Sequence, residues 1–182
     1  MDRAEASRRP PEAIRRLSEV LPDLTEAELD QRCLDAALRF LAPRQRSEQE
    51  IRRRLTEKGH RPDRVERVIA RLRELGLVDD RAFAEFWLDE RARHRPRGAR
   101  ALKAELFQKG IAREVVDQAL DPERDESEDA YRAASRRAAT LSTLDERLFR
   151  QRLAQLLQRR GFGWETIEPV VERLWRERTA AD

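Results

Sequence analysis

Two groups of charged side chains are the residues in this chain whose types and spacing could support chemistry. Asp79 and Asp80 are adjacent carboxylates, and such a pair can hold a magnesium ion. The pair also directly precedes an apolar helical stripe containing Phe83, a place where carboxylates cap a helix and complement its dipole. We predict the capping role, because the position of the pair at a helix start accounts for it.

The second group is strongly basic. Its six members, called here the central basic cluster, are Arg91, Arg93, Arg95, Arg97, Arg100 and Lys103. Residues 91–113 carry eight cations against the single acid Glu105, whereas residues 74–90 carry six acids against one cation. Most charge runs are solvated helix faces with pairs inside the helix, but residues 91–100 have no nearby acid to pair with. This separation of sign indicates a charged partner, and arginine suits carboxylates and phosphates.

Catalytic and cofactor motifs are absent from the sequence. His60 and His94 are the only histidines, Cys33 is the only cysteine, and no zinc-ligand spacing occurs. No phosphate-binding glycine loop, dinucleotide fingerprint or nucleophile elbow is present. We therefore predict a protein that is not an enzyme and that uses no cofactor or metal. A lone cysteine, a charged N-terminus and no long apolar stretch predict a cytoplasmic protein without a membrane segment.

An internal repeat shows which elements position these groups. Three glycines lie 51 residues apart, and each follows a cation and a helical face bearing leucine. The glycines are Gly59, Gly110 and Gly161, and the leucines four residues before them are Leu55, Leu106 and Leu157. Glycine ends helices because it adopts a left-handed backbone at no steric cost, and an amphipathic stripe then begins again. Each copy is therefore predicted to be a helix, a turn and a helix.

A further apolar stripe precedes each copy, so that each unit has three helices. The stripes are Leu34, Ala37, Leu38 and Leu41; Ala82, Phe83, Phe86 and Trp87; and Tyr131, Ala134, Ala138 and Leu141. Capping boxes are predicted at Thr25–Glu28, Ser47–Glu50 and Thr143–Glu146, and Pro62 suits a first helical turn. Pro169 departs from the pattern, so the last helix is expected to start near residues 165–167 or to be kinked.

The predicted fold is all-α, with three tandem three-helix units in an elongated array. Few large apolar groups in 182 residues favour a small core in each unit over one large core. The predicted segments are a leader at 1–24, unit 1 at 25–78, unit 2 at 79–122, unit 3 at 123–178 and a frayed tail at 179–182. The leader is either flexible or a short helix bearing Ile14, Leu17 and Leu21.

Units 1 and 2 resemble the RecX family, bacterial regulators of the RecA recombinase, and the motifs are clearest in unit 2. The resemblance is carried by Asp79-Asp80-Arg81-Ala82-Phe83-Ala84, Arg91, Pro96-Arg97-Gly98, and Lys109-Gly110-Ile111, in that order. It covers roughly residues 31–178 and is weaker in unit 3. It implies helix-turn-helix-like repeats that curve into a crescent. It also implies binding in the groove of the RecA filament on single-stranded DNA, with inhibition of ATP hydrolysis, strand exchange and coprotease activity.

The resemblance also divides the candidate residues by role. The central basic cluster is expected to face the partner, which is either acidic RecA surface or the phosphates of single- or double-stranded DNA. The residues expected to form turns, caps and core are Asp79, Asp80, Phe83, Leu55, Gly59, Gly98, Leu106, Gly110, Ile111, Leu157 and Gly161. We expect a monomer that works without any cofactor.

Two other functions stay open from the residues alone. The first is a helix-turn-helix protein that binds DNA without RecA, and the second is a scaffold that binds no nucleic acid. Residues 112–117, which follow the glycine of unit 2, are neither strongly basic nor rich in Asn and Gln, so they suit base recognition poorly.

Overall fold

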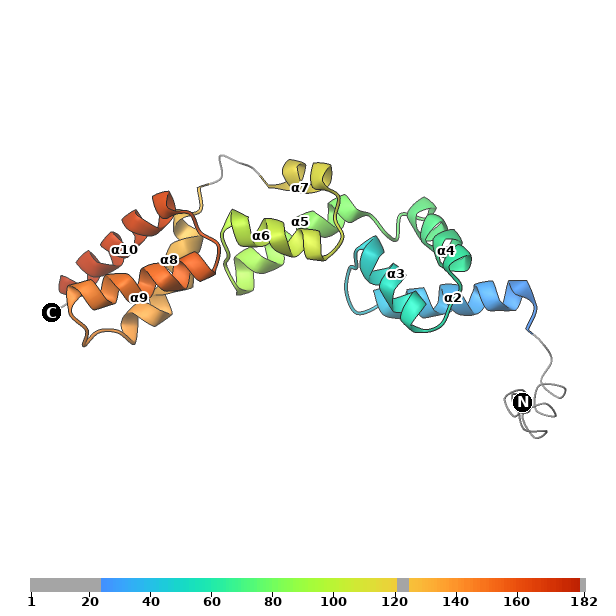
Figure 1. The fold of residues 1–182 in the computed structure, drawn as a ribbon, viewed down its shortest axis with the longest axis horizontal. Helices are drawn as coiled ribbons and strands as arrows, with labels where there is room; N and C mark the ends of the chain where they lie inside the picture. The colour runs from blue at the N-terminus through green and yellow to red at the C-terminus, as the bar shows by residue number, and fades with distance from the viewer. Residues whose placement is uncertain (1–23, 121–124, 181–182) are drawn as a thin grey trace, which may run out of the picture.

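The computed structural model describes residues 24–120 and 125–180, and this part of the chain forms nine helices and no strand. Unit 1 contains α2 (Glu26–Leu41), α3 (Glu48–Glu57) and α4 (Pro62–Glu74); unit 2 contains α5 (Asp80–His94), α6 (Ala99–Gln108) and α7 (Arg113–Ala119); unit 3 contains α8 (Ser127–Ala139), α9 (Glu146–Arg159) and α10 (Trp164–Thr179). The three groups lie in a single elongated row (Figure 1). The predicted all-α fold of three three-helix units is confirmed, while the residue boundaries between units stay a prediction.

Each unit has a hydrophobic core of its own. Buried side chains gather into three separate clusters, one in each group of three helices. The leucines that precede the repeated glycines, Leu55, Leu106 and Leu157, are fully buried, and each belongs to one of these clusters. Because each core draws on few residues, the fold depends on contacts within units and on the contacts between neighbouring units.

The buried faces of the first helices differ in part from the predicted stripes. In α5 the buried residues are Phe83, Ala84 and Leu88, whereas Ala82 is exposed. Apolar residues at adjacent positions permit two overlapping helical faces, and packing of α5 against α7 selects the face that contains Ala84 and Leu88. In α2 the buried set is Cys33, Ala36 and Ala37, and Leu38 lies exposed.

The glycines of the repeat adopt the left-handed backbone that their spacing predicts. The φ angles of Gly59, Gly110 and Gly161 are 81°, 79° and 87°. Complete capping boxes form at Thr25–Glu28 and Ser47–Glu50. The box predicted at Thr143–Glu146 is wrong, because α9 begins at Glu146 and its cap is the Asp145 carboxylate, which accepts from the backbone N–H of Leu148.

The last helix contains its proline and starts earlier than predicted. Its first residue is Trp164, directly after the N-cap Gly163, so Pro169 lies in the second turn. Proline has no N–H, and the carbonyl of Glu165 therefore loses its usual helical donor. The buried face of Ile167, Val170 and Val171 packs against α8 and α9 and holds the helix across this position.

Some predictions fall outside the described residues. The leader residues Ile14, Leu17 and Leu21 lie there, as do residues 121–124 and 181–182. In the described part of the chain, no helix is long and apolar enough to cross a membrane.

Candidate partner-binding surface

The central basic cluster lies at the corner where α5 meets α6. Arg91 and Arg93 are in the last turn of α5, Arg95 is its C-cap, and Gly98 is the N-cap of α6. Arg100 and Lys103 follow at the start of α6, whose first turn has no acidic residue. No carboxylate of α6 itself offsets the positive end of its dipole, and the carboxylate that meets this end is that of Glu126, at the start of unit 3.

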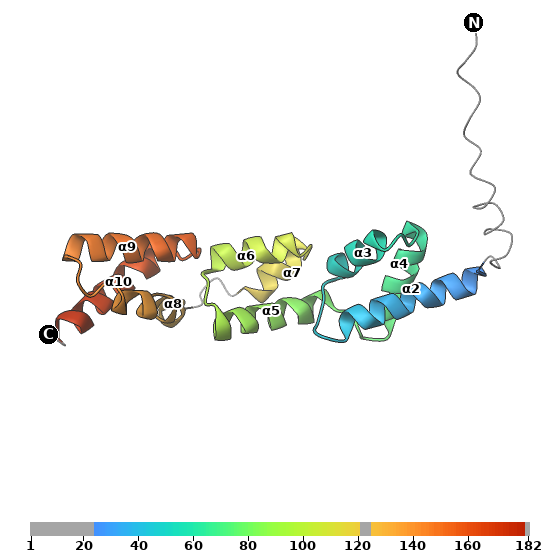
Figure 2. The ribbon, with the colours of Figure 1, turned by 90° about the horizontal axis from the view of Figure 1, so that it is seen from below.

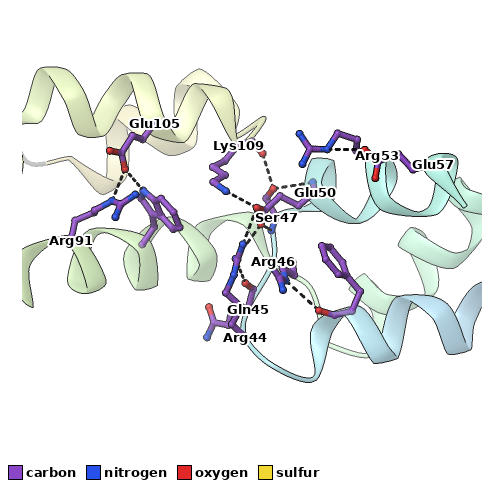
Figure 3. Close-up of polar contacts among 12 residues, drawn as sticks. Arg44, Gln45, Arg46, Ser47, Glu50, Arg53, Glu57, Arg91, Glu105 and Lys109 are labelled. Carbon is purple, nitrogen blue, oxygen red and sulfur yellow. Dashed lines mark hydrogen bonds and ion pairs between the residues drawn. The ribbon is translucent and has the colours of Figure 1, made fainter. Parts of the chain in front are cut away.

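The expectation that residues 91–100 lack acidic partners is wrong at three arginines, Arg91, Arg93 and Arg97. The Glu105 carboxylate lies 2.7 Å from Arg91 and 2.9 Å from Arg97, and it also accepts a hydrogen bond from the Trp87 indole (2.8 Å). The Arg91 contact is shown in Figure 3. Glu105 is the seventh residue of α6. Because α6 runs back alongside α5, its carboxylate meets Arg91 in α5 and Arg97 in the turn between the two helices. Arg91 and Arg97 thus hold the α5–α6 corner together.

The other members of the cluster differ in how available they are. Arg93 pairs with Asp89 on the same exposed face of α5, and Lys103 pairs with Asp117 of α7. Arg95 and Arg100 are exposed and have no acidic partner within residues 24–120 and 125–180. These two arginines are the members of the cluster best placed to contact a partner.

The acidic pair works as two separate caps. The Asp79 carboxylate accepts from the backbone N–H groups of Arg81 and Ala82 and caps α5. The Asp80 carboxylate accepts from the backbone N–H of Glu48, the first residue of α3 in unit 1 (2.9 Å). Burial raises the pKa of the Asp80 carboxyl above its usual value. Within the described residues, no group of three or more potential metal ligands lies together.

A second hydrogen bond between units 1 and 2 starts at Ser47, one residue before Glu48. The Ser47 hydroxyl, at the N-cap of α3, donates to the carbonyl of Lys109 in unit 2 at 2.6 Å (Figure 3). The Glu50 carboxylate forms ion pairs with two cations, at 2.6 Å from Nζ of Lys109 and 3.0 Å from Nη2 of Arg44. The first turn of α3 is therefore completed by groups from unit 2, and we call this contact the first joint.

The same contact recurs 51 residues later as the second joint. The backbone N–H of Gly98, the N-cap of α6, donates to the carbonyl of Arg160 at 3.0 Å. The next N–H, that of Ala99, donates to the Glu126 carboxylate at the start of α8. In each joint, two consecutive residues at the start of a unit's second helix donate hydrogen bonds to the next unit. The first donates to the carbonyl of the residue before a left-handed glycine, and the second donates to a carboxylate at the start of that unit's first helix.

Two of the repeated glycines also provide the close approach that the joints need. A Cβ atom at Gly110 would lie 2.3 Å from Cβ of Gln49, and one at Gly161 would lie 2.4 Å from Cβ of Ala101. A Cβ at Gly59 would meet nothing within 4 Å. Sequence reasoning assigned these glycines to turns alone. The 51-residue register, which pairs Ser47 with Gly98 and Lys109 with Arg160, was the available signal for the joints.

Comparison with known proteins places this architecture in a family. Family models described as the first, second and third three-helix domains of RecX match residues 33–72, 79–120 and 124–171. The chain belongs to the RecX family. The central basic cluster and the Asp79–Asp80 pair lie within the match to the second RecX domain, and the first joint connects the first two matches.

Individual relatives agree with this assignment. Proteins named regulatory protein RecX are 36% identical in Chlorobium limicola over 77% of this chain and 87% of the relative, and 37% identical in Chlorobaculum tepidum over 81% and 91%. A crystal structure of RecX from Lactobacillus salivarius superposes with a TM-score of 0.71 at 24% identity, over 81% of this chain and 97% of that one. The last comparison establishes the fold alone.

The first joint of this RecX chain is expected to weaken in acid. Burial acts to raise the pKa of Glu50, but hydrogen bonds from Arg44 and Lys109 outweigh it and hold the pKa at about 2. A carboxyl whose folded pKa is lowered stabilises the fold above its usual value of 4.5 and loses that contribution as the pH falls toward 2.

Glu50→Gln is therefore expected to lower the free energy of unfolding by about 2 kcal/mol at neutral pH. The difference from wild type should shrink as the pH falls from about 4.5 to 2, as measured by urea unfolding at each pH. Glu57→Gln, at an exposed residue of the same helix, is the matched control. A difference for Glu50→Gln that stayed constant with pH would contradict the assigned role of this carboxylate.

Proposed function

We propose that this protein is a negative regulator of the RecA recombinase that binds in the groove of the RecA filament on single-stranded DNA. Bound there, it inhibits ATP hydrolysis, strand exchange and coprotease activity. The observation that carries the proposal is the match of all three RecX domains along one elongated row, together with relatives named regulatory proteins. A row of joined units presents an extended surface, which suits a partner that is itself a repeating filament.

The central basic cluster is the contact surface in this proposal. Arg95 and Arg100 supply charge that no described acid neutralises, and they lie at the α5–α6 corner, beside the second joint. Arg91 and Arg97 keep that corner in shape through Glu105. The protein acts by binding, as a cytoplasmic monomer, and performs no chemistry of its own.

The test is the ATPase rate of the cognate RecA on single-stranded DNA. Adding the folded protein at amounts near or below those of RecA is expected to lower the rate severalfold, because bound protein restrains the filament on which hydrolysis depends. The control is the same addition after the protein has been heat-denatured. An unchanged rate with folded protein would count against the proposal.

Binding to DNA without RecA is the other candidate, and the geometry of unit 2 disfavours it. The helix after the glycine, α7, has only seven residues, and its cation Arg113 pairs with Asp117. Affinity for single-stranded DNA at several salt concentrations separates the two. Phosphate contact would produce a steep loss of affinity with salt, whereas action through RecA alone predicts no binding to bare DNA.

A further inference from the structure

A groove on unit 3 lies between α8 and α9 and is bordered by positive charge. Its hollow has a volume of about 330 Å³ and is lined by Ala133, Arg136, Arg137, Thr140, Leu156 and Arg160. Three of these lining residues are arginines, and none is acidic. We call this hollow the arginine groove.

The sequence on both sides of the arginine groove is free of acids. Residues 130–144 and 147–164 together carry eight arginines and no Asp or Glu. Folding brings carboxylates to two of the eight, Arg132 and Arg150. The three arginines of the groove have no acidic partner in the part of the chain that the structure describes. Their charge is therefore available to an anion from outside the chain.

Arg160 is held in place at one end of the groove. Its Nη1 donates to the Ala133 carbonyl at 3.0 Å, and its own carbonyl accepts from the backbone N–H of Gly98 in the second joint. Helix α9 continues the line of α6 along one side of the row (Figure 2), so this end of the groove adjoins the α5–α6 corner. The guanidinium is thus positioned before any partner binds, which lowers the entropic cost of binding.

The charge of Arg160 is not stabilised by its surroundings. Burial and the neighbouring charge of Arg97 both lower the pKa of the Arg160 guanidinium. Arg150, on the same helix, shows the opposite shift, because a hydrogen bond to Glu172 raises its pKa. An anion in the groove would give Arg160 the stabilisation that Glu172 gives Arg150.

The rim and the floor of the groove differ in character. Arg152 and Arg159 lie four residues before and three residues after Leu156 on α9, so they share its helical face and extend the basic rim. The floor is apolar, because Ala133 is buried and Leu156 is half-buried. The groove therefore offers cations at its edges and an apolar surface between them.

We propose that the arginine groove binds an acidic segment of the partner protein, in which carboxylates flank an apolar side chain. The carboxylates pair with Arg136, Arg137 and Arg160, since guanidinium groups bind carboxylates in bidentate geometry. The apolar side chain covers Leu156. This contact rests on the proposed function, which identifies the partner as the RecA filament, and it adds a site on unit 3 to the central basic cluster on unit 2.

A nucleic acid fits this groove less well than an acidic segment. Sites for single strands combine cations with aromatic side chains on which bases stack, and no aromatic residue lines the groove. Trp164, which is exposed, lines a different hollow, between α9 and α10. An apolar floor also contributes nothing to phosphate binding, whereas it stabilises an apolar side chain.

The test replaces Arg136 and Arg137 by glutamine, which removes two charges from exposed positions of α8. This α8 variant is expected to bind the cognate RecA filament on single-stranded DNA about tenfold more weakly, because charge-assisted contacts are lost. Arg32→Gln with Arg39→Gln is the matched control, since it makes the same charge change at exposed positions of α2 and should leave binding unchanged. Circular dichroism checks that both variants keep their helices.

A second probe tests the groove without RecA. A short peptide in which aspartates and glutamates flank a leucine is titrated into the full chain, and the backbone amide NMR signals of residues 133–140 and 156–160 are expected to shift. The shifts should persist in the α2 control and vanish in the α8 variant. They should also vanish when the acids of the peptide are replaced by their amides.

The outcomes are distinct. Wild type that binds the peptide but not the filament would refute the proposed function and retain the acidic-segment site. Filament binding by the α8 variant equal to that of wild type would overturn the proposed contact, as would an absence of shifts with the acidic peptide. A single-stranded oligothymidylate that shifts the same signals at lower concentrations than the peptide would also overturn it, because nucleic acid would then be the occupant.

Discussion

Gly110→Val is expected to lower the free energy of unfolding by about 4 kcal/mol, combining backbone strain with overpacking at the first joint. A β-branched residue strains a backbone at φ 79°, and its Cβ would lie 2.3 Å from Cβ of Gln49. Relief of that clash must move unit 2 away from α3, which also breaks the hydrogen bond from Ser47 to the Lys109 carbonyl. Chemical denaturation measures the loss.

Gly59→Val is the matched control, because Gly59 occupies the same place in the repeat at φ 81° with no atom near its Cβ. It reports the conformational strain without the joint. The difference between the two variants is then the contribution of the close approach between units. If both variants were destabilised equally, the close approach at Gly110 would have no energetic weight.

Reversing the charge of Arg95 and Arg100 to glutamate is expected to weaken binding to the RecA filament by roughly a hundredfold or more, since charge-assisted contacts are strong and each becomes a repulsion. Both side chains are exposed and have no acidic partner among the described residues, so helicity and thermal stability should not change. Co-sedimentation with filaments measures the binding, and circular dichroism checks the fold.

Arg97 is left unchanged in this test because it pairs with Glu105, and its reversal would place two carboxylates together at the α5–α6 corner. The control variant carries Arg32→Glu and Arg39→Glu, which make the same change in net charge at exposed positions of α2. Wild-type inhibition of RecA by the Arg95/Arg100 variant would show that the contact lies elsewhere on the protein.

Features that depend on residues close together in the chain were predictable from the sequence. The left-handed glycines and the leucines before them follow from the repeat, because local turn chemistry and a 3.6-residue period leave few alternatives. The Ser47–Glu50 capping box is equally local. Choices between neighbouring candidates were less secure, as the cap of α9 shows, where Asp145 takes the place predicted for Thr143.

Features that depend on contacts between helices were not predictable in this way. Glu105 follows Arg91 by 14 residues, and nothing in the linear spacing shows that the two meet once α6 folds back on α5. The counting of charges along residues 91–113 therefore overstated the free charge of the cluster. Asp80 is similar, because its partner Glu48 lies 32 residues earlier, in a different unit.

The joints also imply an order in which the helices can be completed during synthesis. Units 2 and 3 each supply the groups that complete the second helix of the preceding unit. The Lys109 carbonyl is synthesised 62 residues after the Ser47 hydroxyl from which it accepts a hydrogen bond. A ribosome releases the N-terminal unit first. The hydrogen bonds at the start of α3 therefore form only after unit 2 has been made, and those at the start of α6 only after unit 3 has been made. Loss of residues from the C-terminus thus reaches back into the preceding unit, whereas loss from the N-terminus leaves the later helix starts complete.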